Sequence, residues 1–444
     1  MKLLRILLLM CMVLGLSGYV LFRYYFPQCT LHSKGYGRAT LVHPPAVPQG
    51  LVILLASGSA AQRQDAATRI AATGVLVAVV DGERYLEHLG RAEHRCDKAW
   101  RDAEHLSRHL QRELHGDSYF LPMLAGTGRM ATLVERIVGA APGATLGGAV
   151  GVAPLPTEVC AGRGGAIPAQ SFVDTVAAPA TGTPEAALAT RVAAHLHASG
   201  RGGVLDDLPL IEMSVPRAGA PLAIVLSGDG GWRDIDKGIA EALQRRGIAV
   251  VGWDSLRYFW RVKSPAQSSA DLSRVIAYYQ QRWRSQKILL VGYSFGAATL
   301  PFMYNRLPSS QRSEVGLLAL LGLADKADFQ IRVRGWLHLG ETDDALAVLP
   351  EVARIAPSQL LCVYGDKEKD TLCPSLRARG AQVVALHGGH HFDERPAGLA
   401  SIVENRWQQL SVNEEISSIE FEASVPPSLA TSVAPSHVPA VVRE

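Results

Sequence analysis

A serine lies between two glycines in the segment GYSFG, at the point where an apolar run ends. Gly292, Ser294 and Gly296 follow KILLV, which is typical of a buried strand, and the residues after them have the composition of a helix. Small residues at both flanking positions allow a sharp strand-to-helix turn that exposes the serine hydroxyl above a sheet. The segment predicts that Ser294 is a nucleophile, although a turn whose serine only caps the helix fits the same five residues.

A carboxylate and a histidine follow Ser294 in the order that such a nucleophile requires. QLLCVYGDKEKDTLCP supplies Asp370 and Asp366 after a predicted strand, and we expect Asp370 to be the acid because D-x-x-C-P resembles the acid-bearing loop of many hydrolases. VVALHGGHHFDE supplies His390 and His391, and the pattern G-H-x-F slightly favours His390. We expect the histidine to take the proton of Ser294 and the acid to orient the imidazole, as in acyl transfer.

The negative charge that develops in such a reaction requires two main-chain amides. Phe295, directly after the serine, supplies one, and the glycine-rich segment LSGDGGW supplies the other through Asp229 or Gly230. The clustered histidines could instead bind a metal ion, but no carboxylate motif lies at ligand spacing. We therefore expect no metal and no other cofactor.

Elements that would position these residues are visible as apolar runs that alternate with helical patterns. The runs are LAIVLS, GIAVVGWD, KILLVGYS, EVGLLALLGL, QLLCVYG and AQVVAL. Such alternation predicts a mostly parallel sheet with flanking helices, whose chemistry lies at the carboxyl ends of the strands. With the serine, acid and histidine in this order, the fold class expected is α/β, of the α/β-hydrolase type.

Two stretches of the chain resemble each other. GLVILLASGSAAQRQDAATRIAATGVLVAVVDGERY and PLAIVLSGDGGWRDIDKGIAEALQRRGIAVVGWDSLRY both read as strand, turn, helix and second strand, and LPMLAGTGRMATLV aligns with LLVGYSFGAATLPF. We expect a first domain over residues 40–205 and a second over residues 215–410. In our alignment Thr127 takes the place of Ser294 and Arg129 that of Gly296, so the first domain is expected to be degenerate and non-catalytic.

Composition and the two ends of the chain limit where the protein works. The net charge is only +3, and no basic stripe interleaved with aromatics indicates nucleic acid. Residues 6–22 are uncharged and mostly apolar, so residues 1–23 predict an export signal that is either cleaved or kept as an anchor. Residues 411–444 are rich in Ser, Pro, Val and Glu, and we expect a disordered tail there.

Cysteine spacing fits an exported protein. Cys362 and Cys373 flank one loop and form the stronger disulfide prediction, whereas Cys96 with Cys160 is the weaker one. Buried free thiols are the alternative for each pair. No C-x-x-C spacing indicates zinc or a redox pair.

The motifs SGDGGWRDIDKGIAEAL, VGYSFGA and GGHHFD, with the duplicated architecture, resemble bacterial virulence proteins of the VirJ and AcvB type. The resemblance is strongest over the second copy. It implies an α/β-hydrolase fold and export to the periplasm, and some family members hydrolyse aminoacyl-phosphatidylglycerol to lysine or alanine and phosphatidylglycerol. A shorter form of the family is linked to type IV secretion.

That substrate class would place the protein at the outer leaflet of the inner membrane, held there by residues 6–22. The ammonium of an aminoacyl ester requires acidic residues near the serine, and the candidates are Asp229, Asp234 and Asp254, each of which could equally cap a helix or turn. Two alternatives to this lipid-specific reading are a non-catalytic periplasmic binding or assembly factor that contacts secretion-system proteins, and a general carboxylesterase.

Overall fold

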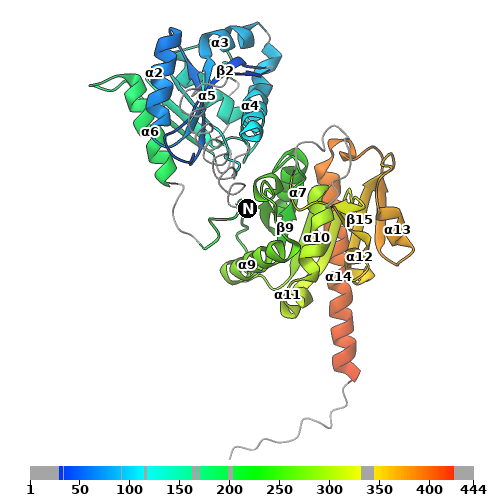
Figure 1. Cartoon of the computed structure of the whole chain (residues 1–444). Coiled ribbons are helices and arrows are strands. Elements are labelled where there is room, and N and C mark those ends of the chain that lie inside the picture. The colour runs from blue at the N-terminus through cyan, green and yellow to red at the C-terminus, as the bar shows by residue number, and fades with distance from the viewer. Residues whose placement is uncertain are drawn as a thin grey trace, which may run out of the picture.

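The computed structural model describes residues 30–424 except residues 34, 92, 115–117, 163–166, 168–170, 199–203 and 332–344. These residues form two domains of one layered design, each a sheet with helices on both faces (Figure 1). The expected α/β class is confirmed for both halves of the chain.

The first sheet has seven strands in the order β1-β2-β4-β3-β5-β6-β7. Their bounds are β1 (Thr30–Ser33), β2 (Gly37–Val42), β3 (Leu51–Ala56), β4 (Leu76–Asp81), β5 (Met123–Thr127), β6 (Gly148–Val152) and β7 (Phe172–Val176). Its helices are α2 (Ala60–Ala71), α3 (Gly82–Gly90), α4 (Ala99–Glu113), α5 (Arg129–Ala140) and α6 (Pro184–Ala198), with a 3₁₀ helix η1 (Glu93–Lys98). Strands β3 to β7 pair in parallel, and β1 and β2 pair antiparallel at one edge.

The second sheet also has seven strands, in the order β8-β10-β9-β11-β12-β15-β16. Their bounds are β8 (Leu210–Met213), β9 (Leu222–Leu226), β10 (Ala249–Trp253), β11 (Ile288–Tyr293), β12 (Val315–Leu321), β15 (Leu360–Gly365) and β16 (Gln382–Leu386), and β13 (Lys326–Ala327) and β14 (Leu346–Ala347) form a separate ribbon. Its helices are α7 (Asp234–Arg245), α8 (Ser255–Tyr258), α9 (Pro265–Trp283), α10 (Phe295–Asn305), α11 (Ser309–Glu314), α12 (Leu349–Val352), α13 (Cys373–Arg377) and α14 (Pro396–Ser424), with η3 (Pro357–Gln359) and η4 (Phe392–Glu394).

The two sheets share one topology, which supports the internal duplication. The run β2-β4-β3-β5-β6-β7 matches β8-β10-β9-β11-β12-β15, and in each run only the first strand is antiparallel to its neighbour. A parallel strand β16 extends the second sheet beyond this common part, whereas the first sheet has the antiparallel strand β1 at its other edge. The loop after β16 therefore has no counterpart among the described residues of the first domain.

Both sheets are buried on both faces, which explains why their strands are apolar without alternation. In β3, Leu51, Ile53 and Leu55 enter one core while Val52 and Leu54 enter the other. Helices α3, α4 and α5 cover the first of these cores, and α2 and α6 cover the second. In the second domain α9 and α10 lie on one face and α7 and α14 on the other (Figure 1).

Both expected disulfides are present, one in each domain. Cys96 is bonded to Cys160 and Cys362 to Cys373. The second bond joins the middle of β15 to the first residue of α13, with a sequence separation of 11 residues, and so closes the loop between them. That short loop lies at the carboxyl edge of the sheet, where the sequence predicts the acid.

The ends of the domains differ from the expected bounds. The first sheet begins at Thr30 rather than near residue 40, and β8 places the start of the second domain before residue 215. Helix α14 continues to Ser424, so the predicted disorder from residue 411 is wrong for residues 411–424. No proline or glycine interrupts this stretch, and extending a formed helix requires no new nucleation. Residues 425–444 lie outside the described residues.

The expected export signal or anchor at residues 1–23 lies outside the described residues. Within the part of the chain that the structure describes, no helix has the length and apolar character needed to cross a membrane.

Candidate active site

Ser294 lies at the junction between β11 and α10 in a strained backbone conformation. Its φ of 53° and ψ of −114° are rare for a residue with a side chain. Its amide donates to the carbonyl of Leu321 at the end of the neighbouring strand, at 2.8 Å. The expected sharp strand-to-helix turn at this serine is therefore present.

Gly292 and Gly296 are required by backbone crowding at this turn. A Cβ at Gly292 would lie 2.5 Å from the carbonyl oxygen of Gly296, and a Cβ at Gly296 would lie 2.5 Å from that of Leu226 on β9. Real Cβ atoms do not approach backbone oxygens so closely. The two glycines thus let helix α10 begin directly against the ends of β9 and β11, which is the reason inferred from the sequence.

His390, in the loop after β16, contacts the serine. Its Nε2 lies 2.7 Å from the Ser294 Oγ, which is hydrogen-bond distance. The imidazole rests on Gly322, the residue after β12, where a Cβ would lie 2.7 Å from the ring Cε1. Of the two histidines that the sequence left open, the structure brings His390 to the serine.

Tyr293 fixes the histidine loop, a role that the sequence analysis missed. Its ring stacks on the His390 imidazole with 5.5 Å between centroids, and its hydroxyl donates to the main-chain carbonyl of His390 at 3.2 Å. The same hydroxyl lies 3.1 Å from Nδ1 of His391, which therefore points at the tyrosine and not at the serine. Burial raises the pKa of the Tyr293 phenol, so this contact is made by the neutral hydroxyl. The only signal in the sequence is that Tyr293 directly precedes the serine.

The carboxylate beside His390 is Glu368, not Asp370. Glu368 Oε2 lies 3.4 Å from the His390 Nδ1, and its side chain is only 9% exposed. Its Oε1 accepts a hydrogen bond from the amide of Gly365 at 3.0 Å. Asp370 is exposed and has no contact with His390 among the described residues, so the prediction that it is the acid is wrong.

Backbone geometry explains why the acid is Glu368. The chain turns back after β15, with the Glu368 amide bonded to the Gly365 carbonyl at 2.9 Å, and this turn directs the residue three positions after the strand toward the site. Asp366, the alternative, instead binds the Gly388 amide at 3.0 Å and lies 3.2 Å from His387. These hydrogen bonds lower the pKa of the Asp366 carboxyl, with the backbone amide as the larger cause.

The glycine-rich turn after β9 lies beside the serine, as the sequence predicts for an oxyanion loop. A Cβ at Gly228 would lie 3.5 Å from the Ser294 Cβ. The Gly228 amide is already bonded to Asp236 at 3.3 Å, whereas Asp229 is exposed at the tip of the turn. Phe295 is the first residue of α10, where amides have no acceptor within the helix. The amides of Phe295 and of Asp229 or Gly230 stay our predicted oxyanion donors.

Asp236 binds main-chain amides of this turn, a role that was not identified from the sequence. It is 2% exposed, and its carboxyl oxygens accept from the Gly228 amide and, at 3.5 Å, from the Arg233 amide. Burial raises the pKa of the Asp236 carboxyl well above its usual range. The residue is the third of α7, a position at which an acid often caps a helix, and that was the available signal.

Asp254 is a helix cap rather than an exposed acid. It is 2% exposed and accepts from the Arg257 amide at 3.2 Å, and burial raises the pKa of its carboxyl. Its counterpart in the first copy, Asp81, caps α3 through Arg84 at 3.1 Å. The first copy makes the same capping contact although it has no catalytic serine, so the contact has a structural role. The prediction that Asp254 binds a substrate ammonium is therefore corrected. The Asp234 side chain lies outside what the structure describes.

The first copy retains the elbow without a nucleophile. Gly128, not Thr127, occupies the position of Ser294: its φ of 59° and ψ of −128° match those of the serine, and its amide donates to the Val152 carbonyl at 3.1 Å. The predicted equivalence of Thr127 with Ser294 is therefore wrong by one residue, and Thr127 aligns with Tyr293. Arg129, the next residue, is paired with Glu83 at 2.5 Å.

Among the described residues, no group of three or more His, Cys, Asp or Glu side chains is arranged to hold a metal ion. Ser294, His390 and Glu368 form the serine, imidazole and carboxylate chain of contacts found in acyl-transfer enzymes.

Comparison with solved structures finds resemblances of low identity. Est1E from Butyrivibrio proteoclasticus is 14% identical, with 46% of this chain and 93% of that chain covered and a TM-score of 0.35. XC6422 from Xanthomonas campestris, described as an α/β serine hydrolase without lid, is 14% identical, with 45% and 87% covered and a TM-score of 0.30. The esterase Pf2001 from Pyrococcus furiosus is 13% identical, with 47% and 94% covered and a TM-score of 0.34.

Comparison by sequence gives one family. No curated protein matches the chain. Residues 220–411 match the family model described as bacterial virulence protein (VirJ). This match spans β9 to α14 and includes Ser294, Glu368 and His390. The second domain of this chain is therefore similar to the VirJ family over residues 220–411, and its fold is a mostly parallel α/β sheet with flanking helices.

Proposed function

We propose that this protein is a serine hydrolase of carboxylic esters, and that its substrate is the aminoacyl ester of aminoacyl-phosphatidylglycerol. The observation that carries the hydrolase proposal is the 2.7 Å contact between Ser294 Oγ and His390 Nε2, with the Glu368 carboxylate on the other ring nitrogen. Neutral His390 takes the serine proton as Oγ attacks the ester carbonyl, and Glu368 stabilises the imidazolium that forms.

The reaction would then proceed in two balanced halves. Collapse of the tetrahedral intermediate transfers the aminoacyl group to Ser294, and His390 returns the proton to the departing glycerol oxygen of phosphatidylglycerol. Water, deprotonated by the same imidazole, then attacks the aminoacyl-serine, and His390 returns that proton to Ser294 Oγ as the ester bond to the serine breaks and the free amino acid leaves. The amides of Phe295 and of the turn after β9 would bind the oxyanion in both halves.

The lipid part of the proposal is supported by the family match and by the charge around the site. The VirJ-type resemblance implies this substrate class for some members. Asp229 is exposed on the turn beside Ser294 and is close enough to contribute to the raised pKa of Tyr293. We propose that Asp229 binds the substrate ammonium, and that the protein works in the periplasm at the outer leaflet of the inner membrane.

The test is release of amino acid from lipid. The full chain in detergent is incubated with lysyl- and alanyl-phosphatidylglycerol and with a neutral acyl ester, beside Ser294→Ala and Asp229→Asn. We expect the parent to release amino acid, Ser294→Ala to lose about 10⁵-fold or more of the rate, and Asp229→Asn to lose activity on the aminoacyl lipids only.

Other outcomes separate the alternatives. Turnover of the neutral ester without release from either lipid would indicate a general carboxylesterase. No turnover of any ester by a folded parent would indicate a binding or assembly factor, which would then be sought among secretion-system proteins. Equal loss on all esters in Asp229→Asn would remove the ammonium-binding role.

A further inference from the structure

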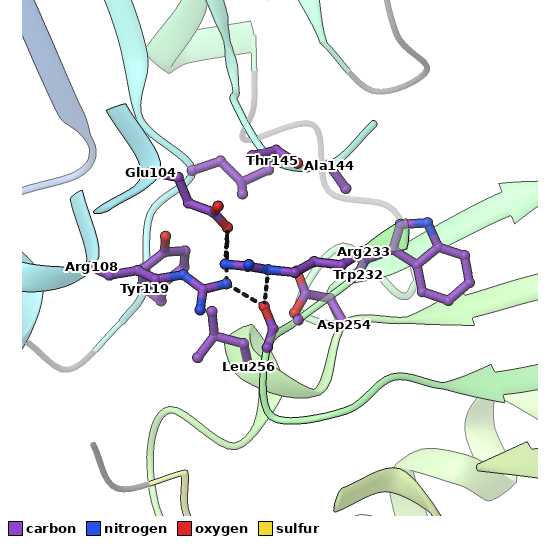
Figure 2. A pocket seen from close by; sticks show the side chains of 12 residues that line it. Glu104, Arg108, Tyr119, Ala144, Thr145, Trp232, Arg233, Asp254 and Leu256 are labelled. Carbon is purple, nitrogen blue, oxygen red and sulfur yellow. Dashed lines mark hydrogen bonds and ion pairs between the residues drawn. The ribbon is translucent and has the colours of Figure 1, made fainter. Parts of the chain in front are cut away.

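The two domains meet at the turn that lies beside Ser294. In the first domain the contact uses α4 and the loop before β6, and in the second it uses the segment from Gly230 to Arg233 and the chain after β10 (Figure 2). Tyr119 and Trp260 add a ring contact across the boundary, with 5.1 Å between centroids. Ala144 of the first domain packs into the second domain's core beside Trp232.

A buried charge cluster lies at the centre of this contact. Glu104 is 4% exposed and Arg108 is 9% exposed, and they pair within α4 at 2.9 Å. Arg233 of the second domain reaches across to the Glu104 Oε1 at 2.6 Å. Figure 2 shows the guanidinium groups of Arg108 and Arg233 side by side beneath this one carboxylate. Burial lowers the pKa of the Arg233 guanidinium, and Glu104 opposes that shift.

Both arginines converge on a single carbonyl. Arg108 donates to the oxygen of Gly230, and Arg233 Nε donates to the same oxygen at 2.9 Å. Gly230 is part of the turn that begins at Gly228 and closes with the Gly231 amide bonded to the Gly228 carbonyl at 3.1 Å. The first domain therefore holds the backbone of the turn whose amides would bind the oxyanion.

We propose that Arg108 is a positioning residue for the site of the other domain: by fixing the Gly230 carbonyl it sets the orientation of the amides between Gly228 and Gly231. The non-catalytic first copy thereby acts as a built-in activator of the second. This inference rests on the proposed hydrolase function, because only an oxyanion-binding turn makes its orientation matter to the rate. It gives the first domain a function even though that domain has no nucleophile of its own.

The contacts of Arg108 restrain its guanidinium, and the cost of misplacing reacting groups sets the size of the effect that we expect. A guanidinium held by a buried carboxylate and a carbonyl has little freedom to move, so it transmits the placement of α4 to the turn. Misplacing reacting groups by about 1 Å costs on the order of 100-fold in rate. Arg233 remains on the carbonyl when Arg108 is removed, and we therefore expect a smaller loss, of about 10-fold in kcat.

The test uses the full chain with Arg108→Ala, Arg108→Lys and the matched control Arg112→Ala. Arg112 lies one turn further along α4, where burial lowers the pKa of its guanidinium and the charges of Arg233 and Asp229 also act on it. Among the described residues it makes no hydrogen bond to the turn, so Arg112→Ala removes a nearby cation without removing a contact to Gly230. On a simple ester we expect Arg108→Ala to lower kcat about 10-fold at unchanged KM. Arg108→Lys should recover part of the rate, since an ammonium can still reach both oxygens, and Arg112→Ala should match the parent.

A second readout does not depend on catalysis. Hydrogen exchange of the Gly228 and Gly231 amides should be faster in Arg108→Ala and unchanged in Arg112→Ala. A lower melting temperature with unchanged kcat and unchanged exchange of these amides would overturn the proposal and leave Arg108 only structural. If parent and Ser294→Ala turn over ester equally, the hydrolase function fails, and the exchange data still decide whether Arg108 holds the turn.

Discussion

The carboxyl edges of the two sheets differ at one position that decides whether chemistry is possible. Gly128 and Ser294 have the same backbone angles within about 15°, and each amide bonds to the end of the adjacent strand. The flanking glycine is also retained, because a Cβ at Gly126 would lie 2.7 Å from the Met130 Cβ. The packing of this fold is therefore sufficient to hold the elbow conformation, and the elbow does not require a serine.

The rest of the catalytic set follows the same division. In the described part of the first domain, the sheet lacks a counterpart of β16, and no loop there corresponds to the one that carries His390. The position of Asp236 in α7 is taken in α2 by Gln62, a neutral residue that caps its helix by accepting from the Ser59 amide at 2.8 Å. The second copy thus differs from the first by an added strand, an added histidine loop and a buried acid under the turn.

Replacing the serine with the residue of the other copy tests this comparison most strongly. Ser294→Gly should lower ester hydrolysis about 10⁵- to 10⁶-fold, because the nucleophile is gone. It should also keep or raise the free energy of unfolding, by up to about 1 kcal/mol, since glycine adopts this φ without strain. Initial rates and urea unfolding measure the two effects. A variant that unfolds more easily would mean that the serine side chain, and not the glycines around it, holds the elbow.

Removing the acid is the next largest effect. Glu368→Gln keeps an oxygen for the Gly365 amide but no charge for His390. We expect kcat to fall about 10³- to 10⁴-fold, because the imidazolium loses its partner. Asp370→Asn is the matched control and should retain parental kcat. Steady-state kinetics in which Asp370→Asn loses kcat and Glu368→Gln does not would show that Asp370, the acid that the D-x-x-C-P motif indicates, is the catalytic one.

These two variants also mark what the sequence can and cannot predict. Ser294 and the layered fold follow from local patterns, because strand periodicity and glycine spacing act over a few residues. The acid depends on the turn after β15, where a difference of two positions decides between Glu368 and Asp370. The offset at Thr127 has the same origin: similar letters aligned one position away from the residue that has the elbow conformation. Contacts across the domains, such as Arg108 with Gly230, leave no local signal.

Asp236, the buried acid that binds the turn after β9, makes the free energy of unfolding depend on pH, which the neutral Gln62 in the first copy cannot do. Burial raises the pKa of Asp236 in the native state, so the native protein holds a proton that the unfolded chain releases. The associated stability is complete below about pH 4 and is lost as pH rises toward the native pKa. Asp236→Asn should remove this loss, so its free energy of unfolding should gain on the parent by up to about 1.4 kcal/mol per pH unit. The free energy of unfolding of both proteins is measured by urea unfolding from pH 4.5 to 8. A constant difference between parent and variant over this range would contradict the prediction.

Installing a serine in the first copy should have the smallest effect. Gly128→Ser reproduces the elbow residue in a backbone that already has its angles. Among the described residues, however, the adjoining Arg129 is paired with Glu83 at 2.5 Å, Glu83 also accepts from Ser57 at 3.0 Å, and no histidine contacts Gly128. A serine without a base stays protonated and is a poor nucleophile. In a Ser294→Ala background we therefore expect no recovery of ester hydrolysis, and the strained angle should lower the free energy of unfolding by about 1 kcal/mol. Recovered turnover would show that the first copy still holds a working base, and that its loss of function rests on Gly128 alone.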